Sequence, residues 1–344
     1  MNILITGGCG FIGCNTALRL LNLGHTVCLF DDLSRVGTDR NLTWLQEQGN
    51  VQFVQGDLRD AEKIAGIVQE SQFDAIIHLA AQVAVTSSVL DPRHDFEVNA
   101  LGTFNLLEAV RLHSPSSAVL YASTNKVYGK LESLKVGEEA NRHFLVELPS
   151  GVPETWPLDF HSPYGCSKGA ADQYMADYAR IYNLRTVTLR QSCIYGYRQF
   201  GVEDQGWVAW FTIAHMLERP ITIYGTGKQV RDVLFIDDLI DCYVAVIERI
   251  DRVAGMTFNI GGGPENSLSL LELLQMLGER FNRPVKHTFS DWRPGDQPVY
   301  ISDISRAQAL LDWTPRVSVS EGITRLSDWI SSNRALFEGS TGRL

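Results

Sequence analysis

The first half of the chain alternates short apolar runs with longer segments of mixed polarity, and this alternation limits the fold more than any other feature. The runs predict strands at Ile3–Thr6, Thr26–Phe30, Val51–Gln55, Phe73–His78 and Ala118–Ala122, with helices at Phe11–Leu23 and Phe96–Leu112. Strands alternating with helices form right-handed βαβ units, whose parallel strands are covered on both faces. This pattern therefore predicts an α/β protein with a doubly wound parallel sheet.

The alternation lapses after Gly129. Residues 131–161 are polar and contain three prolines, which indicates a long functional loop or lid. A helix is predicted to open at Ser162-Pro163, with Ser162 as its N-cap. The second half is less regular: it predicts strands at Leu184–Arg190, Ile221–Tyr224 and Val230–Phe235, and helices at Gly206–Leu217, Ile236–Ile250, Ser267–Phe281 (capped by Asn266 or Ser267) and Ser318–Ser331.

Charge and composition exclude several kinds of partner. A formal net charge of −10, with Arg and Lys scattered singly, leaves no basic stripe for nucleic acid. No apolar run is long enough to span a membrane, and Met1–Ile5 enters a strand without a cationic leader, so we expect a cytoplasmic protein. The six cysteines form no C-x-x-C pair, which predicts buried, reduced thiols and no metal site.

Glycines punctuate the turn between the first strand and the first helix. The segment from Gly7 to Gly13 has a G-x-x-G-x-x-G spacing, which lets the backbone approach a pyrophosphate at the helix N-terminus. Asp31 ends the second strand, 24 residues after Gly7, where a carboxylate accepts from both ribose hydroxyls and repels a 2′-phosphate. This favours NAD over NADP, although Arg35 weakens the exclusion of NADP. The predicted cofactor-binding residues are Gly7, Gly10, Phe11, Ile12, Gly13, Asp31, Asp32, Leu33, Ser34, Arg35, Asp57, Leu58, Leu79, Ala80, Ala81, Gln82, Asn99, Tyr164 and Lys168.

A possible catalytic set lies further along the chain. Tyr164 and Lys168 are spaced i, i+4, so their side chains share one face of a helix. A neighbouring cation can lower the pKa of the phenol from about 10 toward neutrality, which makes Tyr164 a candidate general base for an alcohol. Thr124 lies just past the fifth predicted strand, at the sheet edge where ligands gather, and can orient the reacting oxygen.

These motifs together resemble the extended short-chain dehydrogenase/reductase family, in particular its nucleotide-sugar branch, over nearly the whole chain. More narrowly, several segments are similar to signatures of the CDP-paratose 2-epimerases, also called CDP-tyvelose epimerases. These segments are Ser123–Gly129 (STNKVYG), Asp159–Tyr174 (DFHSPYGCSKGAADQY), His78–Ala84, Arg198–Phe200, Asp204–Trp207 and Gly227–Val233.

The resemblance implies a function and a site. It implies catalysis by Thr124, Tyr164 and Lys168, tightly bound NAD, a CDP-hexose substrate and a homodimer or higher homo-oligomer built from two helices per subunit. Residues 1–183 would form a Rossmann-type NAD-binding domain with the catalytic residues. Residues 184–344 would form a smaller α/β lobe that mainly binds the nucleotide sugar, with some elements returning to the first domain. The expected substrate-binding residues are Val83, Thr124, Asn125, Gln191, Ser192, Gln205, Arg231 and Arg293.

Positions 125 and 126 distinguish between chemistries of this family. Its 4,6-dehydratases carry an Asp-Glu pair after the Thr, whereas Asn125-Lys126 stands here and cannot supply that acid and base. A 2-epimerase that oxidises carbon 2 transiently and reduces it from the opposite face is therefore favoured. Two alternatives stay open: a UDP-hexose 4-epimerase on the same scaffold and a non-catalytic NAD-binding member of the family.

Overall fold

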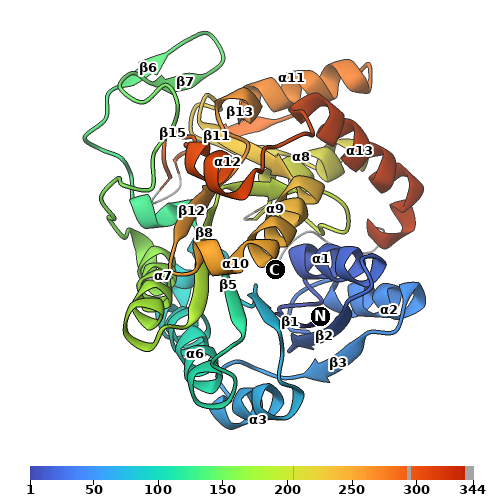
Figure 1. Cartoon of the computed structure of the whole chain (residues 1–344). Coiled ribbons are helices and arrows are strands. Elements are labelled where there is room, and N and C mark those ends of the chain that lie inside the picture. Colours follow the sequence, from blue (N-terminus) through green and yellow to red (C-terminus); the bar gives the residue numbers. More distant parts are fainter. Residues whose placement is uncertain (204, 293–295, 338–344) are drawn as a thin grey trace.

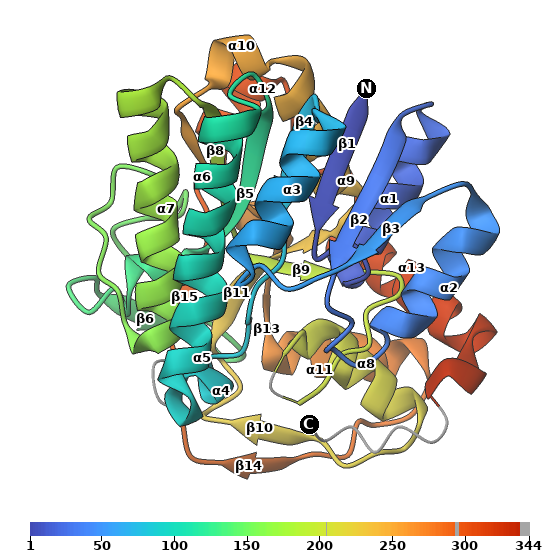
Figure 2. The same cartoon turned by 90° about the horizontal axis from the view of Figure 1, so that it is seen from below.

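A seven-stranded parallel sheet forms the centre of the computed structural model, which describes residues 1–203, 205–292 and 296–337 (Figures 1 and 2). The strands lie in the order β12-β8-β5-β4-β1-β2-β3, and each adjacent pair is parallel. Their bounds are β1 Asn2–Thr6, β2 Thr26–Asp31, β3 Gln52–Gln55, β4 Ala75–His78, β5 Ala118–Thr124, β8 Arg185–Gln191 and β12 Thr257–Ile260. The predicted doubly wound α/β class is confirmed. The strand order reverses between β1 and β4, and a crevice opens there at the carboxyl ends of the strands.

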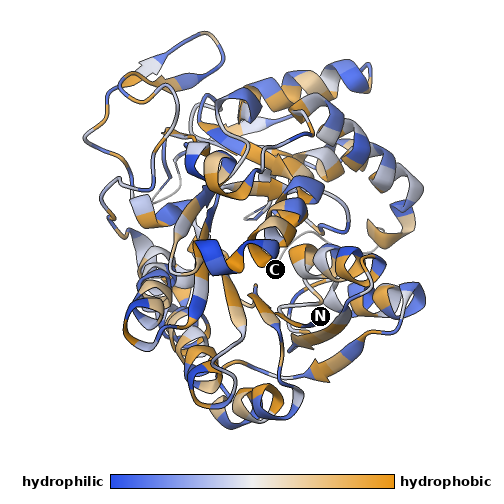
Figure 3. Cartoon of the chain, viewed as in Figure 1, coloured by the Kyte–Doolittle hydropathy of each residue, from blue (hydrophilic) through white to orange (hydrophobic). Residues whose placement is uncertain are grey.

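Helices cover both faces of this sheet. On one face lie α3 (Ala61–Ser71), α6 (Gly102–His113) and α7 (Ser162–Tyr182), and on the other lie α1 (Phe11–Asn22), α2 (Thr38–Gln48) and α9 (Ile236–Glu248). Successive side chains of a strand point to opposite faces, so Ile3 and Ile5 pack under α1 whereas Leu4 packs under α3 and α6. Apolar residues accordingly dominate the inner strands in Figure 3, as expected for a sheet buried on both faces.

The second half of the chain builds a smaller lobe beside the carboxyl ends of the sheet (Figure 1). Its strands are β9 Cys193–Tyr195, β10 Thr222–Tyr224, β11 Val230–Phe235, β13 Ser267–Ser269, β14 Thr288–Ser290 and β15 Val299–Tyr300, and its helices are α8 Trp207–Met216, α11 Leu270–Arg280 and α13 Val319–Ser332. Two further helices, α10 (Ile250–Val253) and α12 (Ser305–Leu311), contact β8 and β12 of the large sheet. β11 pairs with β9, β13 and β15, and β10 pairs with β14. β8 and β12 lie in the large sheet although they follow residue 183. The domain boundary stays a prediction.

Most predicted elements appear within two residues of their expected ends, but three differ in kind. The helix expected at Ser267–Phe281 begins with β13, because residues 267–269 pair with β11 in the antiparallel sense. α11 therefore starts later, and its capping box joins Ser269 and Glu272. The helix expected at Phe96–Leu112 opens with a π turn at Glu97–Leu101, after α5 (Pro92–Phe96).

The third difference lies in residues 131–161, which were expected to be a loop throughout. They contain a hairpin of β6 (Val136–Glu138) and β7 (His143–Leu145) that projects from the body in Figure 1. Leu131, Leu145 and Val152 are buried against Tyr300, so this segment carries its own small core.

Two local predictions about polar and sulfur groups need correction. The N-cap of α7 is His161, not Ser162, although the Ser162 hydroxyl still accepts a hydrogen bond from the N–H of Gly165 at 3.2 Å. All six cysteines are free, as expected, but they are not all buried: Cys166 is exposed and Cys193 is half-buried. No helix within the described ranges is both long and apolar enough to cross a bilayer.

Candidate active site

The glycine-rich turn forms a narrow cradle between β1 and α1. Gly7 has a φ of +68°, and a Cβ there would lie 2.7 Å from the backbone nitrogen of Ala80, so a side chain would close the cradle. Gly10 caps α1 without a side-chain hydrogen bond, and the first turn of the helix lines a cavity. The amide groups there are the donors that a pyrophosphate needs. The residues present therefore fit a dinucleotide.

This cavity has a volume of about 360 Å³ and receives nearly all the predicted cofactor residues. Those that line it are Gly7, Gly10, Phe11, Ile12, Gly13, Asp31, Asp32, Ser34, Arg35, Asp57, Leu58, Leu79, Ala80, Ala81, Gln82, Tyr164 and Lys168. Leu33 and Asn99 are outside its lining. Leu33 instead donates its N–H to Asp31 at 2.9 Å.

Asp31 is held rigidly at the end of β2. Its carboxylate accepts hydrogen bonds from the N–H groups of Cys9 at 3.0 Å and Leu33 at 2.9 Å. Burial raises the pKa of this carboxyl, and the two backbone donors oppose that effect. Each oxygen has a second lone pair, so the carboxylate can still accept from a ribose that enters the cavity. The Asp57 carboxylate is less available to a ligand, because the Arg59 guanidinium binds it at 2.6 Å. The same contact lowers the pKa of the Asp57 carboxyl.

Asn99 does not line the cavity, but it holds Gln82, which does. The π turn places its buried amide against Gln82, whose N–H it accepts at 2.9 Å and whose carbonyl oxygen it donates to at 3.0 Å. The same amide nitrogen donates to Asp95 at 3.1 Å and to the Ser167 hydroxyl on α7. Asn99 therefore positions the loop after β4 relative to α7. A π turn inside a helix often marks a functional site.

A second cavity meets the first at the predicted catalytic residues. Thr124 is the last residue of β5, not just past it, and Tyr164 and Lys168 stand one turn apart on α7. The Lys168 ammonium donates to the carbonyl oxygen of Ala122 at 2.7 Å and lies 4.2 Å from the ring centroid of Tyr121. Tyr164 lines both cavities, so its phenol can reach a substrate and a cofactor together.

Burial dominates the electrostatics of this pair. It raises the pKa of Tyr164 to about 12, which hydrogen bonding to Thr124 partly opposes, and it lowers the pKa of Lys168 to about 7. The expectation that Lys168 brings the phenol toward neutrality is wrong for the protein without ligand, because both groups lose hydration and Lys168 is turned to Ala122. For Tyr164 to act as a base, a ligand complex must add positive charge beside it. Lys168 is placed on the correct helix face to do so.

A buried ion pair anchors α7 to the sheet beneath the site. Arg190 on β8 donates to both carboxylate oxygens of Asp172, at 3.0 and 2.9 Å, and both side chains are almost fully buried. Ser123, beside Thr124, donates to the same carboxylate at 2.7 Å. These contacts fix the distance between the end of β5 and α7, and thus the relative placement of Thr124 and Tyr164.

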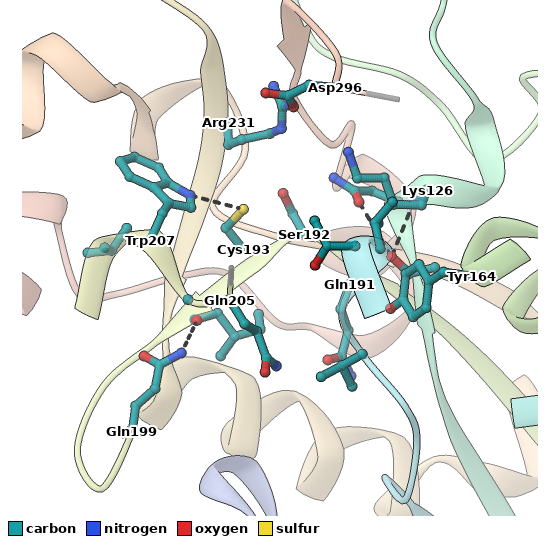
Figure 4. Close-up of a pocket in the computed structure, with 18 of the residues that line it drawn as sticks. Lys126, Tyr164, Gln191, Ser192, Cys193, Gln199, Gln205, Trp207, Arg231 and Asp296 are labelled. Atoms are coloured by element: carbon teal, nitrogen blue, oxygen red, sulfur yellow. Dashed lines mark hydrogen bonds and ion pairs between the residues drawn. The ribbon is translucent and has the colours of Figure 1, made fainter. Parts of the chain in front are cut away.

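The second cavity, of about 410 Å³, runs from Tyr164 into the smaller lobe (Figure 4). The predicted substrate residues that line it are Val83, Thr124, Asn125, Gln191, Ser192, Gln205 and Arg231. Arg293 lies outside the described residues. Two of these side chains are already engaged: Gln191 donates to the Tyr243 hydroxyl at 2.6 Å, and Ser192 donates to Asp232 at 2.5 Å.

Two cationic side chains, Arg231 and Lys126, line this cavity. Arg231 is 7% exposed and pairs with Asp296 at 2.7 Å, which leaves further guanidinium N–H groups for an anion. Lys126 donates to Gln297 at 3.3 Å, and burial together with the charge of Arg231 lowers its pKa to about 8. The two cations oppose each other, and a diphosphate between them would relieve the repulsion. Figure 4 shows both cations among the side chains that line this cavity.

Several lining residues were not predicted as site residues, among them Lys126, Cys193, Glu203, Tyr224, Gln229 and Asp296. One signal was available: Gln229 precedes Arg231 by two residues, and residues two apart on an extended segment face the same way. The others come together only through packing of the smaller lobe. Trp207 also lines the cavity and donates its indole N–H to the Cys193 sulfur at 3.5 Å.

Known proteins with this fold and this arrangement define its family. A family model described as GDP-mannose 4,6 dehydratase matches residues 4–326. CDP-paratose 2-epimerase of Salmonella typhi is 48% identical over 337 residues, which are 96% of this chain and 100% of that protein. The chain therefore belongs to the extended short-chain dehydrogenase/reductase family of NAD-dependent epimerases and dehydratases. The resemblance drawn from the motifs is confirmed.

More distant relatives extend the comparison. UDP-glucose 4-epimerase of Mycolicibacterium smegmatis is 34% identical and covers 94% of this chain and 97% of its own. The structure of UDP-glucose 4-epimerase from Thermotoga maritima with UDP-glucose has a TM-score of 0.82 at 29% identity, covering 97% of this chain and 100% of that one. The Thermus thermophilus UDP-glucose 4-epimerase complex with NAD has a TM-score of 0.80 at 30% identity, covering 96% and 99%.

Proposed function

We propose that this protein is an NAD-dependent 2-epimerase of a CDP-hexose, of the CDP-paratose/CDP-tyvelose or CDP-glucose type. The observation that carries the proposal is the 48% identity to a CDP-paratose 2-epimerase over nearly the full length of both chains. Thr124, Tyr164 and Lys168 support it because they meet where the two cavities join. Asn125 and Lys126 support it because neither can replace the acid and base of a dehydratase.

NAD is the proposed cofactor, and it remains bound through turnover. The glycine cradle fits its pyrophosphate, and Asp31 fits the adenosine ribose while repelling a 2′-phosphate. The Arg35 guanidinium donates a hydrogen bond to Gln205, which lines both cavities. This contact draws Arg35 toward the substrate cavity. Because each turnover leaves the cofactor in its starting form, its release is unnecessary.

The chain's residues then carry out proton transfer and orientation. When bound, NAD would supply the acceptor for a hydride and, in its reduced form, the donor of the same hydride. Tyr164 takes the proton of the carbon 2 hydroxyl as the hydride leaves, and gives it back when carbon 2 is reduced on the other face. Thr124 bonds the same oxygen and fixes its distance from the phenol. Arg231 and Lys126 hold the diphosphate, so that the sugar can turn about its own linkage without leaving the site.

Product analysis tests this function directly. The purified protein is incubated with CDP-glucose, CDP-paratose and UDP-glucose in separate reactions, and the products are identified by NMR. We expect a carbon 2 epimer from a CDP-sugar. A carbon 4 epimer from UDP-glucose would establish the 4-epimerase alternative, which the 34% identity to a UDP-glucose 4-epimerase keeps relevant. Absence of any product would indicate a non-catalytic member.

We also propose that two subunits associate through α6 and α7. These adjacent helices expose large apolar side chains: Leu112 on α6 and Tyr174, Ile181 and Tyr182 on α7, with Phe96 and Leu101 just before α6. An apolar surface of this kind marks an interface. Sedimentation velocity should show a dimer or larger assembly. The Leu112→Glu/Ile181→Glu variant should shift it to monomers, whereas a monomeric wild type would contradict the proposal.

A further inference from the structure

A buried carboxylate lies behind the catalytic pair, and the proposed proton transfer does not use it. Asp95 belongs to α5, a short helix that packs against α7, and it is fully buried. Its Oδ1 accepts a hydrogen bond from the amide of Asn99 at 3.1 Å, and its Oδ2 accepts one from the hydroxyl of Ser167. Both donors are neutral, and no cationic side chain in the described ranges forms an ion pair with this carboxylate. Asp95 is therefore a buried acid without a direct counter-ion.

The surroundings of Asp95 link its charge to Lys168. Burial raises the pKa of the Asp95 carboxyl, and three groups oppose this effect: the Ser167 hydroxyl, the charge of Lys168 and that of the exposed His94. Ser167 immediately precedes Lys168 on α7, so the hydrogen bond to Ser167 fixes this carboxylate beside the start of the Lys168 side chain. The two charges favour each other's ionised form.

Lys168 is in the complementary situation. It is 3% exposed, its ammonium donates to the carbonyl oxygen of Ala122, and no carboxylate forms an ion pair with it among the residues that the structure describes. Asp172 lies one turn further along α7 and also favours the charged form of Lys168, but Arg190 binds both oxygens of that carboxylate. The negative charge of Asp95 is not compensated in this way.

The other titratable groups around Lys168 add no negative charge at neutral pH. The ring of Tyr121 lies 4.2 Å from the ammonium, and burial raises the pKa of its phenol well above the usual value. Burial lowers the pKa of His78 to about 3, so its imidazole is neutral. Tyr164 keeps its proton, since burial raises its pKa to about 12, and the nearby Arg35 is itself a cation.

We propose that Asp95 is a positioning residue that acts through Lys168: its buried carboxylate keeps the Lys168 amine protonated, so that a positive charge is available to Tyr164. A negative charge in surroundings of low dielectric constant stabilises an ammonium strongly. Without that charge, burial favours the neutral amine. The use that Tyr164 makes of the ammonium rests on the proposed function, whereas the protonation of Lys168 can be measured without any substrate.

NMR titration of Lys168 tests this in the protein as purified with its cofactor. Lysine is labelled with ¹³C at Cε, and the Lys168 resonance is identified by its absence from Lys168→Met. Asp95→Asn removes the charge and keeps the size of the side chain. The pKa of Lys168 should therefore fall by about one unit or more in this variant, the usual effect of an opposite charge nearby. Lys126 is an internal control in the same spectrum, because burial and Arg231 determine its pKa and Asp95 has no part in it.

Two further variants distinguish charge from structure. Asp95→Glu keeps the carboxylate, so its Lys168 midpoint should lie closer to that of the wild type than to that of Asp95→Asn, even where the longer side chain lowers the melting temperature. Asp91→Asn is the matched control: it neutralises an exposed carboxylate at the N-cap of the same helix, where Asn caps as well as Asp. It should leave the midpoint unchanged. A Lys168 midpoint that stays in place in Asp95→Asn, or that moves equally in Asp91→Asn, would overturn the proposal.

The pH dependence of kcat is the second measurement, made with saturating CDP-sugar so that the titration of Lys126 does not enter through KM. The acid limb of the profile should move to lower pH in Asp95→Asn, because its first deprotonation removes positive charge from the Tyr164–Lys168 pair, a step that Asp95 opposes. A kcat that falls equally at every pH would indicate a structural role and count against the proposal. A shifted Lys168 midpoint in a protein that forms no carbon 2 epimer would support the role of Asp95 and reject the proposed function.

Discussion

Tyr164→Phe is expected to lower kcat for 2-epimerisation by about 10²- to 10⁴-fold, the range that a positioned general acid or base contributes. The substitution removes the hydroxyl that exchanges a proton with the sugar and keeps the buried ring. Affinity for CDP should not change, because its diphosphate is proposed to bind Arg231 and Lys126. The measurement is the initial rate of epimer formation with saturating CDP-sugar, together with calorimetric binding of CDP.

Tyr174→Phe is the matched control for this experiment. Tyr174 lies on the same helix, is 44% exposed and faces away from both cavities. It should keep wild-type kcat. If Tyr164→Phe retained more than a third of the wild-type rate, the phenol would not be the group that moves the proton.

The second large effect concerns the diphosphate. Arg231→Ala should raise the KM for the CDP-sugar by roughly 10- to 100-fold, because a charge-assisted hydrogen bond contributes about 1.5–3 kcal/mol. The bound cofactor should stay in place, since Arg231 lines the substrate cavity and not the cofactor cavity. Steady-state kinetics give the KM, and the absorbance of denatured protein after filtration gives the cofactor content.

Two variants sharpen the interpretation of that result. Arg231→Lys keeps the positive charge but loses the planar fork, so its KM should lie between those of the wild type and Arg231→Ala. Arg219→Ala, whose side chain donates to the carbonyl oxygen of Phe337 outside both cavities, should leave the KM unchanged. An unchanged KM in Arg231→Ala would remove this residue from the substrate site.

Most strands and helices could be predicted from the local sequence pattern. The elements that were missed depend on tertiary contacts. The first five strands and α1 could be predicted because each combines an apolar run with its own boundary residues. β12 was missed because Thr257–Ile260 is a short run whose strand state depends on pairing with β8. Residues 267–269 were predicted helical because their strand state depends on pairing with β11. Partners distant in sequence decide such segments.

Some features of the site could likewise be predicted from local pattern, whereas others depend on tertiary packing. Tyr164 and Lys168 could be placed together because a helix turn determines their spacing, and Asp31 because strand ends meet at one edge of the sheet. The pKa values of these three side chains could not be predicted, because burial by the whole fold determines them. Glu203 and Gln229 both form hydrogen bonds with Tyr224 of β10, and no local spacing predicts this. The contact of Asn99 with the cofactor stays a prediction. Its hydrogen bonds to the backbone of Gln82 could not be predicted, because they depend on the direction of one side chain.

The fate of the hydrogen at carbon 2 tests the central claim most directly. The reaction is run with unlabelled CDP-sugar in D₂O, and the recovered epimer is analysed by NMR and mass spectrometry. Transient oxidation returns the same hydrogen from the cofactor, so carbon 2 of the product should contain no deuterium. Incorporation of solvent deuterium at carbon 2 would show removal of that hydrogen as a proton and would contradict the mechanism proposed for Tyr164, Thr124 and Lys168.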